Sequence, residues 1–124
     1  MKKQNFLLYV LMLAGFTSCR WSDGGNTNIS YNEWSHYYSM KAHFNKNKTR
    51  TVENYMDERI GDQSNMSFAN TRIDGQIALD DHTIFYIKKY PGLLEIKLDK
   101  DKNSHESYQK IRAMCEGIKE VVAK

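Results

Sequence analysis

The side chains best suited to chemistry lie in two polar segments of this sequence. Asp80, Asp81 and His82 are consecutive, and His105 stands beside Glu106. A carboxylate next to an imidazole can act as a general acid and base or bind a metal ion, because histidine titrates near neutral pH. Polar residues are also the usual occupants of tight turns. A small enzyme, metal-binding or inhibitor domain that uses Asp81, His82 or His105 is therefore the alternative hypothesis.

Other signatures of catalysis or metal binding are incomplete. The segment 99–103 opens like a calcium-binding loop, but Ser104 stands where that loop needs glycine and Lys110 where it needs glutamate. Cys115 lies on an apolar stripe, where a thiol is expected to be buried and inert. The sequence has no glycine-rich phosphate loop and no paired-cysteine or paired-histidine zinc motif. We predict no catalytic residue, no metal and no cofactor.

Composition bounds the class of protein. The chain has 124 residues, 40% of them hydrophobic and 27% charged, which suits one small globular domain. The formal net charge is +3, but Lys2 and Lys3 belong to an amino-terminal leader. Without them sixteen basic residues face fifteen acidic ones, a net charge of +1. A balance this even gives no electrostatic reason to expect nucleic acid as a partner.

The first eighteen residues have the three-part layout of an export signal. Two lysines precede an apolar run over residues 6–16, after which hydroxyl side chains lead to Cys19. An apolar helix of this length spans about 16 Å, roughly half of the hydrocarbon thickness of a bilayer. A permanent transmembrane helix is therefore not expected, and no small-residue pattern of an ordinary cleavage site ends the run.

The ending Phe16-Thr17-Ser18-Cys19 resembles the lipobox of bacterial lipoproteins, with Phe16 at a position where that family most often has leucine. The resemblance implies that residues 1–18 are a signal peptide, cleaved before Cys19. It also implies that the Cys19 thiol is alkylated by a diacylglycerol and that the new amino group is acylated. Two or three acyl chains on one residue attach a protein almost permanently. The alternative is cleavage at another site, with Cys19 unmodified.

Residues 19–30 are rich in glycine, asparagine and serine and have no apolar periodicity. This composition predicts a lipidated tether, followed by a single domain over residues 31–124. Some lipoproteins carry an acidic run here that directs them to the outer face, whereas this chain has only Asp23. The resemblance therefore implies an outer-membrane lipoprotein that faces the periplasm, with the cell surface as the alternative.

A first helix is predicted over about Tyr31–Phe44, because Ser30 and Glu33 have the spacing of a capping box. Its aromatic side chains recur at helical spacing: Trp34, Tyr37, Tyr38 and Phe44. Most of such a face would pack on a sheet, whereas a ring left at the surface would serve as an amphipathic anchor for a partner. We therefore take Trp34, Tyr37 and Tyr38 as candidate binding residues.

Two more helices are predicted. The basic connector Asn45–Arg50 is expected to be a solvated loop or a contact for anionic lipid head groups. A short helix is expected to follow over Val52–Ile60, between Thr51 as cap and Gly61 as stop. The last helix has an apolar stripe that steps by three and four residues over 108–122.

Between these helices the apolar period changes to two. Alternation predicts strands over Ile73–Leu79, Thr83–Lys89 and Leu93–Leu98, and the short turns between them require antiparallel neighbours. The predicted fold class is α+β: a small two-layer domain in the order α-α-β-β-β-α, with a three-stranded antiparallel meander covered by helices.

These features predict a membrane-anchored envelope lipoprotein that acts as a non-enzymatic binding or assembly module. The expected partners are the lipid bilayer, through acylated Cys19, and an envelope protein. An accessory of an envelope-spanning secretion apparatus, such as a type VI system, is one context for a lipoprotein of this size. No motif in the domain itself identifies a family.

Overall fold

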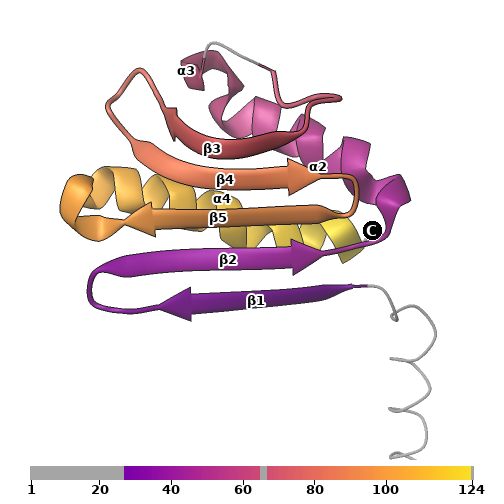
Figure 1. Cartoon of the computed structure of the whole chain (residues 1–124), viewed down its shortest axis with the longest axis horizontal. Helices are drawn as coiled ribbons and strands as arrows, with labels where there is room; N and C mark the ends of the chain where they lie inside the picture. Colours follow the sequence, from indigo (N-terminus) through magenta and orange to yellow (C-terminus); the bar gives the residue numbers. More distant parts are fainter. Residues whose placement is uncertain (1–26, 65–66, 124) are drawn as a thin grey trace, which may run out of the picture.

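The structure, a computed structural model, describes residues 27–64 and 67–123. Its elements follow one another in the order β-β-α-β-β-β-α (Figure 1). The strands are β1 (Asn28–Glu33), β2 (Tyr37–His43), β3 (Ile73–Ala78), β4 (Ile84–Tyr90) and β5 (Leu93–Asp99). The helical segments are η1 (Lys46–Lys48), α2 (Thr49–Met56), η2 (Asp57–Gly61), α3 (Asp62–Ser64), η3 (Lys100–Lys102) and α4 (His105–Ala123).

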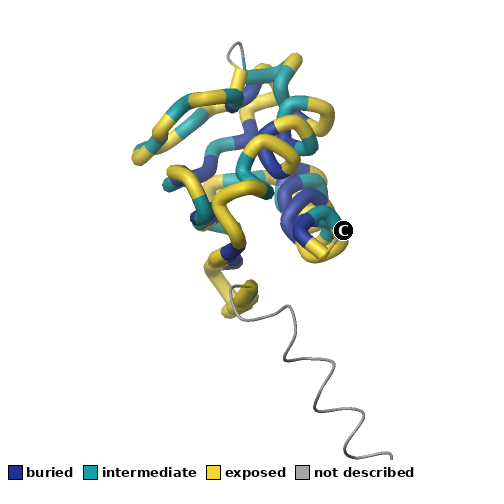
Figure 2. The backbone as a smooth tube through the Cα atoms, turned by 90° about the vertical axis from the view of Figure 1, so that its right-hand side faces the viewer, coloured by how far each residue is buried: buried dark blue, intermediate teal, exposed yellow. Residues whose placement is uncertain are grey.

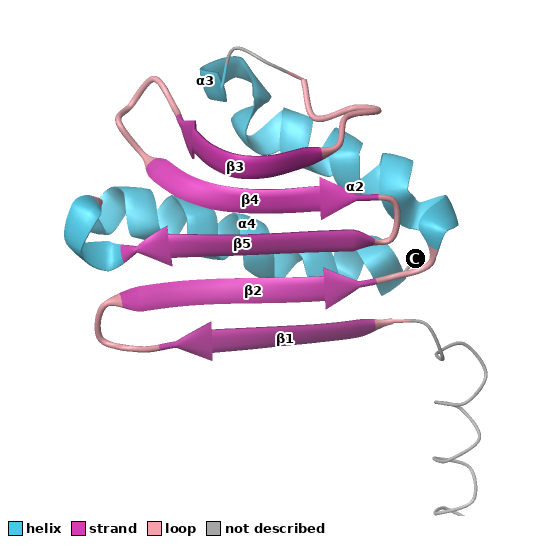
Figure 3. Ribbon diagram, in the orientation of Figure 1, coloured by secondary structure: helices cyan, strands magenta, loops and turns pink. Residues whose placement is uncertain are grey.

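All five strands form one antiparallel sheet in the order β1-β2-β5-β4-β3. The helices α2 and α4 cover one face of this sheet and leave the other face open (Figure 3). The central pairing of β2 with β5 sets Met40 opposite Ile96 and Tyr38 opposite Leu98. The first and last strands of the sheet, β1 and β3, are its two edges.

The core lies between the sheet and the two helices, where Figure 2 shows the buried positions. Strand β2 contributes alternate residues to it: Tyr38, Met40, Ala42 and, just past its end, Phe44. Helix α4 contributes the predicted stripe: Ile111, Met114, Cys115, Ile118 and Val122. Side chains at this spacing share one face of a helix, so α4 presents a continuous apolar surface to the strands.

The predicted order α-α-β-β-β-α and the three-stranded meander are wrong. The segment 31–44 lies in the β1–β2 hairpin and its extension, so the first predicted helix does not exist. The aromatic residues at helical spacing obscured a second pattern, the alternation of buried and outward residues over 38–44. Aromatic residues favour strands, and the buried Met40 and Ala42 fit a period of two only. The hairpin also includes Asn28–Ser30, which the sequence assigned to the tether.

The remaining elements agree more closely with the sequence. The three predicted strands are β3, β4 and β5, and the last predicted helix is α4. The second predicted helix exists, but it begins at Thr49 and continues past Gly61 through a π-helical turn into α3. Val52, Met56 and Ile60 are buried along it, at the predicted spacing.

Gly117 sets how closely α2 approaches α4. The Tyr55 hydroxyl of α2 donates a hydrogen bond to the Met114 carbonyl of α4 at 3.0 Å. A Cβ atom added at Gly117 would lie 2.0 Å from the oxygen of that hydroxyl, far inside van der Waals contact. A side chain at position 117 would therefore displace the Tyr55 ring from this hydrogen bond.

One ion pair is buried beneath the helical layer. The Lys89 ammonium of β4 lies 2.7 Å from the Glu53 carboxylate of α2, and their side chains are only 2% and 4% exposed. The same ammonium donates to the Thr71 carbonyl, and the backbone N–H of Asn70 donates to the Glu53 carboxylate at 3.1 Å. Both charges therefore have hydrogen-bond partners, which a buried ion pair needs if its desolvation is to be compensated.

The two ends of the sheet differ in their connections. At the end that we call the Asn28 end, Asn28 pairs with His43, and the described chain begins. At the opposite end, the Trp34 end, a short turn joins β1 to β2. Figure 1 shows that β1 runs the length of the sheet between them.

Candidate functional site

Two large aromatic side chains are exposed at the Trp34 end. Trp34 is 58% exposed and Tyr37 is 49% exposed, more than any other large hydrophobic residue in the described part of the chain. The Trp34 N–H donates to the Tyr37 carbonyl at 2.8 Å and closes the β1–β2 turn. Tryptophan and tyrosine at a surface combine a large apolar area with a polar group, which is why they dominate binding energy at protein interfaces.

The turn that carries Trp34 is held by Lys100. The Lys100 ammonium lies 2.9 Å from both the Trp34 carbonyl and the Glu33 carboxylate, and the Lys100 N–H donates to the His36 carbonyl at 2.8 Å. The Tyr108 hydroxyl also donates to Glu33. The hydrogen bonds from Tyr108 and Lys100 lower the pKa of Glu33, so this carboxylate stays charged. A turn fixed in this way loses little conformational entropy when it binds.

Tyr37 lines a shallow cleft of about 220 Å³ on the open face of the sheet. The Lys97 ammonium lies 5.7 Å from the centre of the Tyr86 ring, within the range of a cation–π contact. The Tyr86 hydroxyl donates to Asp74 at 2.8 Å, and this hydrogen bond raises the pKa of Tyr86 to about 12. The cleft therefore combines aromatic walls with three charged side chains, those of Lys97, Asp99 and Lys102.

Tyr38, the third candidate binding residue, lies in the core. It is 3% exposed and meets Tyr108 of α4 edge to face, with ring centres 6.0 Å apart. Its side chain points toward α4, whereas Tyr37 lies on the open face, because neighbouring residues of a strand face opposite sides. Tyr38 therefore offers no surface to a protein partner, and Trp34 and Tyr37 are the exposed members of the predicted group.

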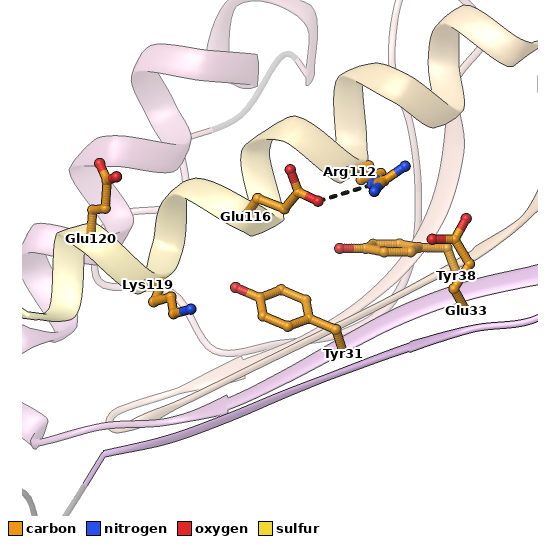
Figure 4. A pocket seen from close by; sticks show the side chains of 7 residues that line it. All are labelled: Tyr31, Glu33, Tyr38, Arg112, Glu116, Lys119 and Glu120. Carbon is orange, nitrogen blue, oxygen red and sulfur yellow. Dashed lines mark hydrogen bonds and ion pairs between the residues drawn. The ribbon is translucent and has the colours of Figure 1, made fainter.

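A second cleft, of about 510 Å³, lies between β1 and α4 (Figure 4). Tyr31 crosses it, and its hydroxyl donates to the Cys115 carbonyl at 3.2 Å. Arg112 and Glu116 form an ion pair at 2.9 Å along α4. The Tyr38 hydroxyl faces this region and has no hydrogen-bond partner of normal geometry among the described residues.

The Cys115 thiol beneath this cleft is not activated. Burial raises its pKa to about 12, and the neighbouring Tyr38 hydroxyl opposes that shift only in part. A nucleophilic cysteine needs a lowered pKa or an adjacent base, because the thiolate is the reactive form. Cys115 is a core residue of α4, as the sequence predicted.

Asp81 has a structural role in the β3–β4 turn. Burial raises the pKa of Asp81, but hydrogen bonds from Lys110 and Thr83 outweigh that effect and hold the pKa at about 2. One carboxylate oxygen accepts from the Thr83 N–H at 3.1 Å and from its hydroxyl at 2.7 Å, while the other pairs with Lys110. A carboxylate stabilised in its charged form is a poor proton acceptor at neutral pH.

The two histidines of the alternative hypothesis have separate surroundings. His82 is exposed in a left-handed backbone conformation, with φ of 71°. His105 begins α4, and its ring centre lies 5.9 Å from that of Tyr108. Neither histidine lines the two clefts described above. Within residues 27–64 and 67–123, no group of three or more histidine, cysteine or acidic side chains is placed to hold a metal ion.

Sequence reasoning missed Tyr86, Lys97 and the Lys100 contacts. Tyr86 and Lys97 could have been predicted as outward-facing residues, because they alternate with buried residues along β4 and β5. The contacts of Lys100 could not have been predicted, because its partners in the β1–β2 turn lie 66 and 67 residues away in the sequence. Cys19 and the leader lie outside the described residues. Among those that are described, no helix has the length and apolarity needed to cross a membrane.

Comparison with known proteins gives this chain no family. It matches no protein-family model, no curated protein and no solved structure. The arrangement of its own residues is therefore the basis for a functional proposal.

Proposed function

We propose that this chain is an outer-membrane lipoprotein, anchored through acylated Cys19 and facing the periplasm, that acts as a non-enzymatic binding or assembly module. The lipobox-like ending of the leader supports the anchor. The exposed Trp34 and Tyr37 support a protein partner in the envelope. An accessory role in an envelope-spanning secretion apparatus fits the same properties.

The observation that carries this proposal is the position of the aromatic pair relative to the anchor. The described chain begins beside Asn28, at the end of the sheet opposite Trp34. Six residues of β1 separate the two ends, or about 20 Å at 3.3 Å per residue. A chain attached to a bilayer through Cys19 would therefore present Trp34 and Tyr37 away from the attachment point.

Replacing Cys19 with serine should release the protein from the membrane. Serine has no thiol to alkylate, so the variant would lose its acyl chains, and the described residues contain no helix able to insert. Membrane fractionation together with labelling by a radioactive fatty acid would measure both effects. A Cys115→Ser variant is the matched control and should stay labelled and membrane-bound. A Cys19→Ser protein that remains acylated would contradict the proposed anchor.

Replacing Trp34 with alanine should abolish recovery of the partner. Truncating an exposed aromatic anchor at an interface costs about 2 kcal/mol or more, which weakens binding by about thirtyfold. The measurement is crosslinking in intact cells followed by identification of the attached protein. Circular dichroism and membrane fractionation must first show that the variant is folded and attached.

The control for Trp34→Ala is the double change Asp81→Ala with His82→Ala. It alters the polar turn between β3 and β4 and leaves both exposed aromatic residues in place. Because Asp81 binds Thr83 and Lys110, circular dichroism and membrane fractionation must first show that this double variant is folded and attached. We then expect its partner recovery and cellular phenotype to be near those of the unchanged protein. The reverse outcome, an inert Trp34 variant and an inactive turn variant, would favour the enzyme or metal-site alternative.

A further inference from the structure

A third cleft, of about 530 Å³, opens at the Asn28 end of the domain. Its lining comes from three separate segments: η1 with the start of α2, the chain just before β3, and the β4–β5 turn. Three of the lining side chains are cationic, Lys46, Arg50 and Arg72, and two carry amides, Asn47 and Asn70. This combination offers charged and neutral donors to an anion.

The cations of this cleft are largely unneutralised. No ion pair is recorded for Lys46 or Arg72 among the described residues, and Arg72 lies 5.7 Å from the centre of the Tyr90 ring. Arg50 donates one hydrogen bond to the Asn70 amide oxygen at 3.1 Å and lies 3.9 Å from Glu53. Most of its guanidinium donors therefore remain available, since this group has five.

The only carboxylate that lines the cleft does not cancel these charges. Glu53 is paired with the buried Lys89 ammonium and accepts from the Asn70 backbone N–H. The ion pair is close to neutral as a unit, so the three surrounding cations set the sign of the field. It also fixes the floor of the cleft, because both side chains are almost fully buried. The cleft is thus a preformed site of net positive charge.

Charge is distributed unevenly between the two ends of the sheet. Three connecting segments lie at the Asn28 end, and none contains an acidic residue: 43–51, 69–73 and 89–93. The segments at the Trp34 end carry six carboxylates: Glu33, Asp80, Asp81, Asp99, Asp101 and Glu106. Three lysines accompany them: Lys100 and Lys102 in the same segments, and Lys110 of α4, which pairs with Asp81. An anionic surface would therefore attract the Asn28 end and repel the other.

The covalent chain places this positive end near the proposed anchor. The described chain begins at Thr27, eight positions after Cys19, so the distance between these two residues is at most about 28 Å. Asn28 pairs with His43, and Lys46 of the cleft follows His43 by three positions. The cleft thus lies at the same end of the sheet as the start of β1, from which the chain would lead to the membrane.

We propose that this cleft binds the phosphate group of an anionic lipid head group and so orients the domain on the membrane. The inference rests on the proposed membrane attachment, and charge complementarity selects the ligand. Arg50 and Arg72 supply planar donors that match phosphate oxygens, and Lys46 supplies a mobile ammonium. Binding here would turn the Asn28 end toward the bilayer and leave Trp34 pointing away.

The test uses the full chain mixed with vesicles of phosphatidylcholine alone or with added phosphatidylglycerol. Flotation first measures attachment, and an amine-acylating reagent followed by mass spectrometry then measures the labelling rate of each lysine. Lys46 reports on the cleft, and the exposed Lys102 at the opposite end is the internal reference. A third sample contains phosphatidylcholine vesicles and inorganic phosphate.

We expect phosphatidylglycerol to slow the labelling of Lys46 by about fivefold relative to Lys102, the ratio that corresponds to about 1 kcal/mol per cation at an anionic surface. Phosphatidylcholine, with or without inorganic phosphate, should leave the ratio of the two rates unchanged. Equal protection by inorganic phosphate, or by phosphatidylcholine alone, would overturn the assignment to an anionic lipid. Absence of protection in every sample would overturn the site.

The flotation result separates this inference from the proposed anchor. Flotation with both lipids but no protection of Lys46 would leave the anchor standing and refute the lipid site. Flotation with phosphatidylglycerol vesicles alone, with Lys46 protected, would support the lipid site and refute the anchor. Flotation with neither vesicle would refute both.

A matched pair of variants assigns the effect to the cleft. Arg72 and Lys97 each place a cation 5.7 Å from the centre of a tyrosine ring of β4, but only Arg72 lines the cleft. Arg72→Gln should raise the labelling rate of Lys46 on phosphatidylglycerol vesicles severalfold, whereas Lys97→Gln should leave it unchanged. Equal effects of the two variants would show that general surface charge, and not this cleft, causes the protection.

Discussion

Replacing Lys89 with methionine should lower the free energy of unfolding by about 3–5 kcal/mol. The change removes the ammonium that neutralises Glu53 and leaves a carboxylate that is only 4% exposed. A small domain is stable by about 5–15 kcal/mol in total, so this loss would bring the protein close to unfolding. Urea denaturation followed by circular dichroism would measure it.

Two further variants show whether the loss comes from the uncompensated charge. Lys89→Met combined with Glu53→Gln should recover much of the stability, because the glutamine is neutral and can still accept from the Asn70 N–H. Lys88→Met changes the same charge one residue away, on the open face, and should have little effect. A Lys89→Met protein as stable as the Lys88→Met protein would contradict the buried ion pair.

Replacing Ile111 with aspartate should destabilise the domain by several kcal/mol, because it buries a charge that has no partner. Ile111 is fully buried and belongs to the apolar stripe by which α4 covers the sheet. Thermal unfolding should show a melting temperature lower by well over ten degrees, since each kcal/mol shifts it by about 4–8 °C in a domain of this size.

The control is Ala113→Asp, which adds the same charge to the exposed side of α4. Its melting temperature should lie within a few degrees of that of the unchanged protein, because exposed substitutions alter stability by about 0.5 kcal/mol. Equal losses for the two variants would mean that aspartate harms α4 wherever it stands. No loss for Ile111→Asp would place this face of the helix in solvent.

The second half of the fold could be predicted from the sequence because its signals are local. Alternation marks β3, β4 and β5, and their turns are short enough to fix antiparallel neighbours. The stripe of α4 has no competing period. The turn after Tyr90 closes at Gly92, whose φ of 86° a glycine adopts easily.

The first half could not be predicted, for two physical reasons. The aromatic residues of 31–44 fit a helical period as well as a strand, and the capping-box spacing of Ser30 and Glu33 decided wrongly for the helix. The pairing of β2 with β5 joins residues that are 50 positions apart at His43 and Leu93 and 62 apart at Tyr37 and Asp99, and no short turn connects the two strands to reveal it. Strand order in a sheet depends on such distant contacts, which a local pattern does not contain.

The candidate sites also differ in how much of them the sequence could predict. Trp34 and Tyr37 were identified as candidate contact residues from their chemistry, although the element that positions them is a hairpin and not a helix. The cationic cleft combines Arg50 and Arg72, which come from different segments. Only the connector Asn45–Arg50 was visible as a candidate head-group contact, because the segments before β3 and after β4 join it only when the sheet has formed.

The path of β1 has a mechanical consequence. Suppose a moving partner pulls on Trp34 while Cys19 is held in the bilayer. The load would then travel along one covalent strand, from Asn28 to Glu33 and into the turn. Both attachment points lie at the ends of β1, so the tension passes along its covalent backbone and places little load on the hydrogen bonds between β1 and β2. The helices and the inner strands would remain outside the force path, and the module could transmit tension without unfolding its core.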